Sequence, residues 1–402
     1  MSSGLNNSAI KLEPCGPIAI IGHTANEEFV RSVSDILSMK RAKRVETEAS
    51  PFVHRPGYYR SDYVFPSKLV RFQTGEGKMT IGESVRGHDV FIITDPVSQN
   101  ESFPLLEGEH VISPDDHYRD LLRIVNVCKG KARRVNIIMP FIYEGRTESR
   151  NNSRQSLDCA AMLRQLYELG IANFICFDPH DDRIMNAVPL LSIETPRTQY
   201  KIITTLLNRF GSIKIDKDST VVVSPDEMGV SRDIFYSNKL GLPLGIFYRD
   251  RDYSTIVDGE HPVKSYKFLG DDISGKDVLL IDDMINSGNT MLSTSKKLKD
   301  LGAKDIYCLS PFGLFTDGYE VFDKAYREGT IKAVLCTNLT YRSPELLAQE
   351  WYIDVNMVPF VARLIDALNV DESVFDLINS TTRLNDFLGQ IRIGEVFDEF
   401  DG

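Results

Sequence analysis

Short apolar runs alternate with longer amphipathic stretches along most of the chain. This alternation is typical of parallel strands joined by helical crossovers, so it predicts an α/β fold. The predicted strands are residues 18–21, 90–94, 135–139, 174–177, 220–224, 244–247, 278–281, 306–309 and 333–336. The predicted helices are residues 27–39, 117–129, 156–169, 199–210, 232–240 and 291–301. Because ligands of open α/β sheets bind at the carboxyl ends of strands, we expect a site in the loops that follow these strands.

The chain of 402 residues is long enough for two domains of ordinary size. Two successive halves with a similar strand and helix rhythm meet near residues 190–200. We therefore predict an N-terminal domain over residues 1–195, a C-terminal domain over 196–380 and a tail over 381–402. A basic, then Tyr- and Pro-rich stretch at about 40–70 shows no clear period. We interpret it as an insertion or a long surface loop rather than a nucleic-acid-binding patch, because basic runs are usually solvated.

Composition excludes several classes of protein. With 42% apolar and 26% charged residues, the chain matches neither disordered nor membrane proteins. The 46 Lys and Arg against 57 Asp and Glu give a net charge of -11, which argues against a general nucleic-acid binder. The six cysteines form no C-x-x-C pair, so we interpret them as reduced core residues. Neither a secretory signal nor a long uncharged apolar stretch is found, and we expect a cytoplasmic protein without a membrane partner.

One segment is chemically specific. The predicted strand 278–281 is followed directly by DDMINSGNT, residues 282–290, and then by an amphipathic helix. Small residues in such a turn let backbone N–H groups surround a phosphate at the helix N-terminus. Two adjacent carboxylates suit the hydroxyls of a sugar, so the segment predicts a sugar-phosphate site. The alternative is a plain turn in which Ser287 or Thr290 caps the helix and the Asp pair is solvated.

This segment resembles the phosphoribosyl pyrophosphate (PRPP) loop that phosphoribosyltransferases share with ribose-phosphate pyrophosphokinases. Further segments resemble the pyrophosphokinases and occur in the same order. They are residues 72–76 (FQTGE), 81–87 (IGESVRG), 140–143 (PFIY), 153–154 (SR), 178–180 (DPH), 223–226 (VSPD), 249–251 (RDR) and 313–315 (GLF). The resemblance extends from about residue 16 to 378. It implies two tandem phosphoribosyltransferase-type domains, each a mainly parallel sheet flanked by helices.

The resemblance also implies an activity. Ribose-phosphate pyrophosphokinases (PRPP synthetases) convert ATP and ribose 5-phosphate into AMP and PRPP. They transfer the diphosphoryl group to the anomeric hydroxyl in line at the β-phosphorus, with Mg²⁺. They assemble into dimers and hexamers, often with ATP sites completed by a neighbouring subunit. On this resemblance we expect a homo-oligomer that binds ATP, ribose 5-phosphate and Mg²⁺, and no nucleic-acid partner.

Site residues are carried over by motif. For ribose 5-phosphate, Asp282 would hold the ring hydroxyls and Asp283 would assist. The 5-phosphate would be held by Asn286, Ser287, Gly288, Asn289 and Thr290. For ATP, Phe72, Thr74 and Glu76 would contact the base and Arg146 would contact the phosphates. Thr147, beside Arg146, would also bind ATP. The alternative for Arg146 is a surface ion pair.

The same resemblance assigns metal and catalytic residues. His180 and Asp226 would reach Mg²⁺ or its water shell, although a lone His is more often structural. Arg249 and Arg251 occupy the start of the mobile catalytic loop, which would continue through Gly259. The alternative is that they are two solvated arginines in a charged loop.

Three departures from the pattern of the family lead to a second hypothesis. Thr74 and Asn286 each replace an Asp, and Arg249 replaces a Lys. They suggest a catalytically weak or inactive homologue that regulates a true synthetase. A phosphoribosyltransferase that uses PRPP with a base is a third reading, but such an enzyme does not need the segments that imply an ATP site.

Overall fold

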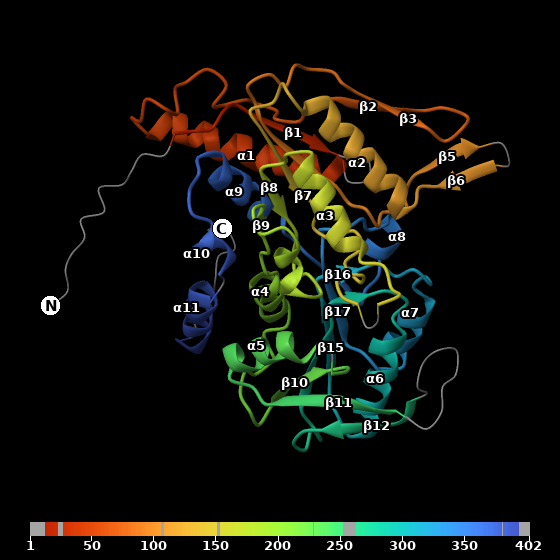
Figure 1. Cartoon of the computed structure of the whole chain (residues 1–402). Helices are drawn as coiled ribbons and strands as arrows, with labels where there is room; N and C mark the ends of the chain where they lie inside the picture. Colours follow the sequence, from red (N-terminus) through yellow and green to blue (C-terminus); the bar gives the residue numbers. More distant parts are fainter. Residues whose placement is uncertain are drawn as a thin grey trace.

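The structure is a computed structural model that describes residues 13–22, 27–105, 108–150, 153–227, 229–251, 263–379 and 381–393. Its first sheet has five parallel strands in the order β1-β4-β7-β8-β9 (Figure 1). They are β1 (Ile18–Gly22), β4 (Asp89–Ile93), β7 (Arg134–Ile138), β8 (Asn173–Ile175) and β9 (Ser192–Glu194). The apolar runs bury both faces of the central strands, as expected for a parallel sheet between helices.

The second sheet has seven strands in the order β12-β11-β10-β13-β15-β17-β18. All neighbours in it are parallel except β12, which pairs antiparallel with β11 at the edge. The strands are β10 (Thr220–Ser224), β11 (Leu244–Arg251), β12 (Val263–Leu269), β13 (Asp277–Ile281), β15 (Ile306–Ser310), β17 (Ala333–Thr337) and β18 (Tyr352–Val355). All nine strands predicted from the sequence are therefore present.

Helices cover both faces of each sheet. On the first sheet, one face packs against α2 (Pro114–Cys128) and α3 (Asp158–Glu168), and the other against α1 (Glu27–Thr47) and α9 (Val358–Asn369). On the second sheet, one face packs against α6 (Asn289–Asp300), α7 (Glu320–Arg327) and α8 (Pro344–Leu347), and the other against α4 (Gln199–Arg209), α5 (Val230–Leu240) and α11 (Thr381–Ile393). The α/β fold class is confirmed.

The smaller elements connect these layers. Two antiparallel hairpins project from the first sheet, β2 (Ser67–Arg71) with β3 (Gly77–Ile81) and β5 (Ser102–Leu105) with β6 (Gly108–Val111). The short strands β14 (Met284–Ile285) and β16 (Phe312–Gly313) pair beside the second sheet. The remaining described helices are the 3-10 helix η2 (Asp182–Ala187) and α10 (Phe375–Ile378).

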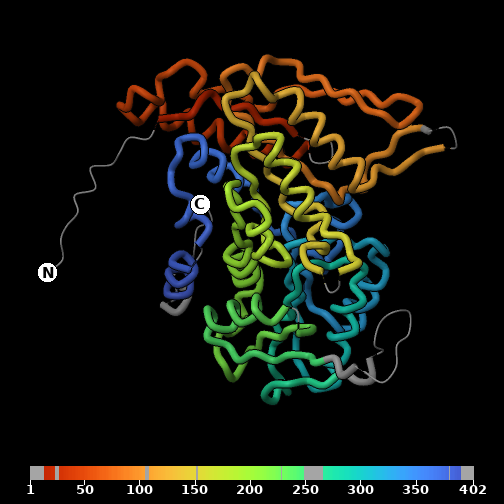
Figure 2. The backbone as a smooth tube through the Cα atoms, viewed as in Figure 1, coloured from red at the N-terminus to blue at the C-terminus, as the bar shows by residue number. Residues whose placement is uncertain are grey.

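Helix α9 crosses back from the second sheet to the first. It follows β18 in the chain, yet it lies beside α1 and contributes to the core on that face of the first sheet (Figure 2). The division into residues 1–195 and 196–380 stays a prediction. The core of the first layer nevertheless depends on residues from both predicted segments.

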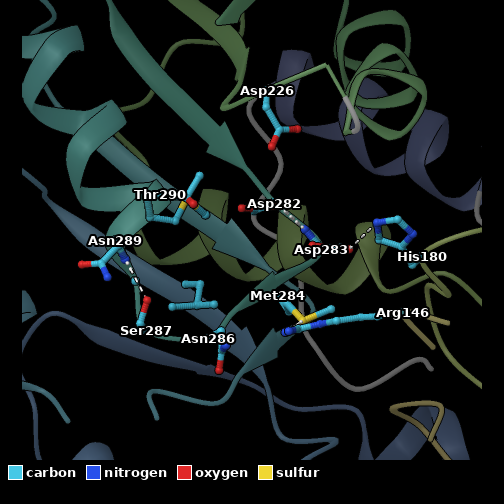
Figure 3. Close-up of a pocket in the computed structure, with 13 residues that line it drawn as sticks. Arg146, His180, Asp226, Asp282, Asp283, Met284, Asn286, Ser287, Asn289 and Thr290 are labelled. Atoms are coloured by element: carbon cyan, nitrogen blue, oxygen red, sulfur yellow. Dashed lines mark hydrogen bonds and ion pairs between the residues drawn. The ribbon is translucent and has the colours of Figure 1, made fainter. Parts of the chain in front are cut away.

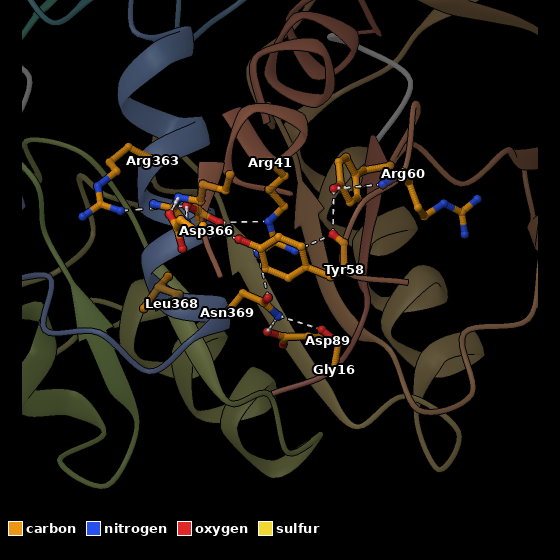
Figure 4. A network of polar contacts seen from close by, with 12 residues as sticks. Gly16, Arg41, Tyr58, Arg60, Asp89, Arg363, Asp366, Leu368 and Asn369 are labelled. Carbon is orange, nitrogen blue, oxygen red and sulfur yellow. Dashed lines mark hydrogen bonds and ion pairs between the residues drawn. The ribbon is translucent and has the colours of Figure 1, made fainter. Parts of the chain in front are cut away.

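Two expectations for irregular segments are wrong in part. Residues 40–47 continue helix α1 instead of forming a loop, and Arg41, Tyr58 and Tyr63 from the 40–70 stretch are buried. The reason is specific pairing: the Arg41 guanidinium donates to Asp366 at 2.9 Å, to the Tyr58 carbonyl oxygen and to Asn369 (Figure 4). In the predicted tail, residues 381–393 form α11, which buries an apolar face against α4 and α5. Residues 394–402 lie outside the described residues.

Five of the six cysteines are buried, as expected for core residues, whereas Cys15 is half-buried, and all six are free thiols. Over the described ranges, none of the helices combines the length and the apolar character that crossing a bilayer requires.

Candidate functional site

The loop after β13 opens into a pocket of about 320 Å³ (Figure 3). Arg146, His180 and Asp226 line the same pocket, and each follows a different parallel strand, β7, β8 or β10. The loop contributes Asp282, Asp283, Met284, Ile285, Asn286, Ser287, Gly288, Asn289, Thr290 and Met291. The pocket therefore lies where the carboxyl ends of strands from both sheets meet, as expected for open α/β sheets.

The backbone of the loop leaves the start of α6 open. Gly288 has a φ of 84°, and a Cβ atom there would lie 2.3 Å from the ring of Phe322, so the position requires glycine. No side chain caps α6, and the Ser287 hydroxyl only accepts a 3.4 Å hydrogen bond from the Asn289 N–H. The capping turn considered from the sequence is therefore not formed. The first-turn N–H groups and the helix dipole favour an anion at this point.

The two carboxylates of the loop are partly buried rather than fully exposed. The backbone N–H of Asp283 donates to Asp282 at 2.9 Å, and both side chains are partly buried. Burial and the adjacent Asp283 carboxylate raise the pKa of Asp282 well above its ordinary value, and Arg232 opposes this. A partly buried carboxylate pair is costly unless hydroxyl donors or cations satisfy it. The pair is thus arranged to take such a ligand.

Two further residues contact residues of the site, and the sequence pattern does not reveal them. Arg232 on α5 is 12% exposed, its Nη2 lies 3.9 Å from Asp283 Oδ2, and its buried Nη1 has no hydrogen-bond partner among the described residues. Glu148 is 8% exposed, its Oε1 lies 3.1 Å from His180 Nδ1, and within the same ranges its buried Oε2 has no partner. A usable signal for Arg232 was its place in the first turn of the helix that follows the VSPD segment. Glu148 sits in an irregular segment with no such signal.

The structure places His180 by means of a strained turn after β8. Asp178 is buried with a φ of 38°, and its Oδ2 accepts from the backbone and the hydroxyl of Thr198 at 2.9 and 2.5 Å. This fixes the turn so that His180 Nε2 lies 3.8 Å from Asp283 Oδ2. Across the pocket, the Ser224 hydroxyl donates to the carbonyl oxygen of Asp226 at 2.8 Å and supports the turn after β10.

Of the two further residues predicted to bind ATP, Arg146 lines the pocket and Thr147 does not. The Arg146 guanidinium reaches the pocket and lies 2.7 Å from the sulfur of Met284. The Thr147 hydroxyl donates to the Glu144 carbonyl oxygen at 2.9 Å and accepts from the N–H of Cys159 at 3.1 Å. Thr147 therefore supports the start of α3 and does not line the pocket.

The residues predicted for the base lie apart from the pocket of their own chain. Phe72, Thr74 and Glu76 occupy the turn between β2 and β3, where Phe72 is 49% exposed and the Thr74 hydroxyl donates to Glu76 at 3.0 Å. Arg71 forms an ion pair with the buried Asp120 and fixes the hairpin to α2. None of the three predicted residues lines the pocket described above.

The predicted catalytic arginines lie at the end of β11. Arg249 is paired with Tyr266 and Arg251 with Val263 in the ladder between β11 and β12. Their backbone is thus part of a strand, whereas the sequence analysis placed them at the start of a loop. Their side chains lie outside the described residues, as does the rest of the predicted loop through Gly259.

Asp233 on α5 is a buried carboxyl group whose raised pKa can be tested by experiment. It is fully buried on α5, and neither carboxylate oxygen has a hydrogen-bond partner within the described part of the chain. Burial raises its pKa to about 7, although Ser224 and Arg232 lower it. Because the folded state keeps this proton to higher pH than the unfolded state, its contribution to stability falls as the pH rises from about 4 to 7.

Replacing Asp233 by Asn should remove this loss of stability with rising pH. At pH 8 the variant should be more stable than the wild type by up to ~4 kcal/mol, and the difference should shrink toward pH 4. Urea unfolding across this range measures it, with Asp218→Asn on the exposed surface as the control. A difference between variant and wild type that does not change with pH would contradict the assignment.

Fold and site together define a protein of the phosphoribosyltransferase type. In it, a buried strand leads into a loop with a carboxylate pair, and an uncapped helix start follows. Comparison with family models gives the same class: residues 193–325 match the phosphoribosyl transferase domain, and residues 18–170 match the N-terminal domain of ribose phosphate pyrophosphokinase. The chain therefore belongs to the ribose-phosphate pyrophosphokinase family, as a divergent member.

Individual relatives agree with this family. Ribose-phosphate pyrophosphokinase 2 of Saccharomyces cerevisiae is 26% identical over 309 residues, which covers 76% of this chain and 87% of the relative. The protein of the same name from Schizosaccharomyces pombe is 27% identical over 273 residues, 67% of this chain and 76% of its own. The crystal structure of phosphoribosylpyrophosphate synthetase from Mycobacterium smegmatis shares the fold, with a TM-score of 0.66 and 21% identity over 87% of this chain and 98% of that chain.

Proposed function

We propose that the chain is an active ribose-phosphate diphosphokinase. It transfers the diphosphoryl group of ATP to the anomeric hydroxyl of ribose 5-phosphate and releases PRPP and AMP. The observation that carries the proposal is the single pocket in which the loop 282–290 meets Arg146, His180 and Asp226. Its family relatives bear the name of this activity.

The sugar phosphate fits one side of the pocket. Its 5-phosphate accepts hydrogen bonds from the open N–H groups at the start of α6, with Ser287, Asn289 and Thr290 around it. Asp282 accepts hydrogen bonds from the ring hydroxyls, which relieves the unfavourable burial of its carboxylate. The Asp283 N–H donates to that carboxylate at 2.9 Å, and Arg232 lies 3.9 Å from the Asp283 carboxylate.

Mg²⁺ fits the donors on the opposite side. Asp226, Asp283 and His180 line the pocket, but the described residues contain no preformed group of three or more ligands for a metal ion. This suits an ion that keeps several waters and takes much of its coordination from substrate phosphates. Mg²⁺ bound there would neutralise negative charge on the diphosphate.

Phosphoryl transfer requires little covalent chemistry from the protein, so positioning and positive charge supply most of the catalysis. Arg146 reaches the pocket and is suited to pair with ATP phosphate oxygens through two N–H groups. We assign Arg249 and Arg251 to the charge that develops on the transferred group. This assignment rests on their match to the Lys-x-Arg of the family.

The base-contact residues suggest how the ATP site is completed. Phe72, Thr74 and Glu76 match the base-binding segment of the family, yet they lie outside the pocket of their own chain. We propose that the chain forms a homo-oligomer, a dimer or a hexamer, in which the β2–β3 hairpin of a neighbouring copy reaches the pocket.

The regulatory homologue is the second candidate. The departure that motivates it within the pocket is Asn286, whose side-chain oxygen accepts a 3.0 Å hydrogen bond from the Thr316 hydroxyl. An Asp at this position could accept the same hydrogen bond and would add a negative charge to the pocket. The substitution therefore changes the charge of the loop rather than this contact.

Product formation separates the two candidates. Purified protein with ATP, ribose 5-phosphate and Mg²⁺ should form AMP and PRPP in equal amounts, and omission of either substrate should abolish both products. Absence of both products, with ATP binding retained in calorimetry, would instead support the regulatory homologue.

A further inference from the structure

Glu148 is a buried carboxylate that lies beside the candidate pocket and contacts one of its lining residues. Its side chain is 8% exposed, and its Oε1 lies 3.1 Å from His180 Nδ1. Its Oε2 is buried and has no hydrogen-bond partner within the described ranges. Burying a carboxylate is costly unless its oxygens are satisfied, so a contact that only stabilised the fold would be expected to use both oxygens. The contact with His180 therefore requires a different explanation.

The loop after β7 fixes the position of Glu148. Glu144 has a φ of 59°, and its carbonyl oxygen accepts hydrogen bonds from the N–H and the hydroxyl of Thr147, both at 2.9 Å. The Thr147 hydroxyl in turn accepts from the N–H of Cys159, in the first turn of α3, at 3.1 Å. Glu148 is the next residue after Thr147. The turn that Thr147 ties to α3 therefore holds the backbone from which the Glu148 side chain extends.

The His180 ring lies between carboxylates from the two sheets. Its Nδ1 is directed at Glu148, in the loop after β7 of the first sheet. Its Nε2 lies 3.8 Å from the Oδ2 atom of Asp283, in the loop after β13 of the second sheet, as the dashed line in Figure 3 shows. The ring is 30% exposed, and His180 lines the pocket. The nitrogen opposite Glu148 is therefore the one on the side of the pocket.

The contact with Glu148 decides which ring nitrogen carries a proton. An ionised carboxylate accepts hydrogen bonds and has no proton to donate, so its neighbour Nδ1 must be the donor. When the ring is neutral, its lone pair then lies on Nε2. Without such an acceptor, the proton can sit on either nitrogen and the ring is free to turn.

We propose that Glu148 is a positioning residue, which keeps a proton on His180 Nδ1 and directs the Nε2 lone pair into the pocket. Carboxylates that accept from a histidine in this way orient many metal-binding histidines, and their removal typically costs roughly 10- to 100-fold in metal affinity or activity. The proposal rests on the proposed function in one respect, namely that Nε2 then faces the substrate diphosphate or its Mg²⁺. The orientation of the ring is a property of the free chain, so it can be tested without turnover.

Modification by diethyl pyrocarbonate tests the orientation, because the reagent attacks a ring nitrogen that carries no proton. The free full-length wild type, Glu148→Gln and Glu148→Met are treated at about pH 8, where a free imidazole is neutral, and His180 is followed by mass spectrometry. His180 should react several-fold more slowly in Glu148→Met, because the proton can move to Nε2 and the bare Nδ1 then faces a buried side chain. Glu148→Gln keeps an oxygen that accepts from Nδ1, so His180 should react as in the wild type.

The exposed His54 is the internal control for this modification and should react equally in all three proteins. Circular dichroism checks that each variant is folded, and Glu148→Ala replaces Glu148→Met if the latter does not fold. If His180 reacts in Glu148→Met as fast as in the wild type, or faster, the proposal is overturned.

Kinetics then tests whether Glu148 acts through His180. Glu148→Met should lower kcat for PRPP formation by roughly 10- to 100-fold and leave KM for ribose 5-phosphate unchanged, and Glu148→Gln should restore most of kcat. In a His180→Ala background Glu148→Met should have no further effect, because the residue that it positions is absent. Glu168→Met makes the same replacement on an exposed part of α3 and should keep the wild-type kcat.

Equal losses from Glu148→Met with and without the His180 side chain would contradict a positioning role. If the wild type forms no PRPP, the proposed activity fails, and the modification of His180 in the free chain still decides the role of Glu148. The two failures are therefore distinguishable.

Discussion

Asp282→Asn should lower kcat/KM for ribose 5-phosphate by roughly 10²- to 10³-fold, the effect of losing charge-assisted hydrogen bonds to sugar hydroxyls. The physical reason is that the neutral amide replaces a carboxylate that is held beside Asp283 and opposite Arg232. Steady-state kinetics with ribose 5-phosphate as the varied substrate measures this effect.

The fold should survive this change. Removing a charge from a buried carboxylate pair relieves repulsion, so the midpoint of thermal unfolding should stay the same or rise. Asp300→Asn, at the exposed end of α6, is the matched control and should keep full activity. Unchanged affinity of Asp282→Asn for ribose 5-phosphate would contradict the placement of the sugar.

Arg41→Met should lower the free energy of unfolding by about 3–5 kcal/mol, the usual cost of removing one partner from a buried ion pair. Arg41 is fully buried and donates to Asp366, Asn369 and the Tyr58 carbonyl oxygen, so the change leaves the Asp366 carboxylate and the Asn369 oxygen without these donors. Urea unfolding measures the loss.

Exposed Arg31 on the same helix provides the control. Its ion pair in the described part of the chain is with Glu27 at the surface, and Arg31→Met should cost less than about 1 kcal/mol. Adding Asp366→Leu to Arg41→Met should recover part of the loss, because it removes a carboxylate that has lost its buried partner and keeps only Arg44 at 2.8 Å and Arg363 at 3.8 Å. Equal losses for Arg31→Met and Arg41→Met would show that the buried network contributes no special stability.

The strands could be predicted because burial on both faces of a parallel sheet requires continuous apolar runs. Val278, Leu279 and Leu280 form such a run, and all three are buried residues of β13. The edge strand β12 was missed for the same reason, since its residues Lys267 and Tyr266 face solvent and carry no apolar run. Pattern analysis thus finds the centre of a sheet more readily than its edge.

Long-range pairing could not be predicted. Arg41 lies in a basic run that reads as solvated, and only its partners on α9, more than 300 positions away, explain its burial. The buried face of α11 has the same origin, because Leu384 and Phe387 are covered by α4 and α5. Local sequence does not show which part of the chain returns to cover it.

Part of the candidate site could be predicted from the sequence, and part of it could not. The loop 282–290 was identified from its residues, since a strand followed by two carboxylates and a small-residue turn suits one kind of ligand. The structure places Arg146, His180 and Asp226 around it, and their roles stay predictions. Arg232 and Glu148 were missed because their role depends on contacts with Asp283 and His180, which spacing does not show.

The most direct test of the proposed activity follows the terminal phosphate of ATP. Wild-type protein is incubated with Mg²⁺, ribose 5-phosphate and ATP labelled at the γ-phosphorus, and the products are separated. We predict that the label appears in PRPP together with an equal amount of unlabelled AMP, and that Asp282→Asn slows both. Label that remains in ATP, or that appears only as inorganic phosphate with ADP, would contradict the account.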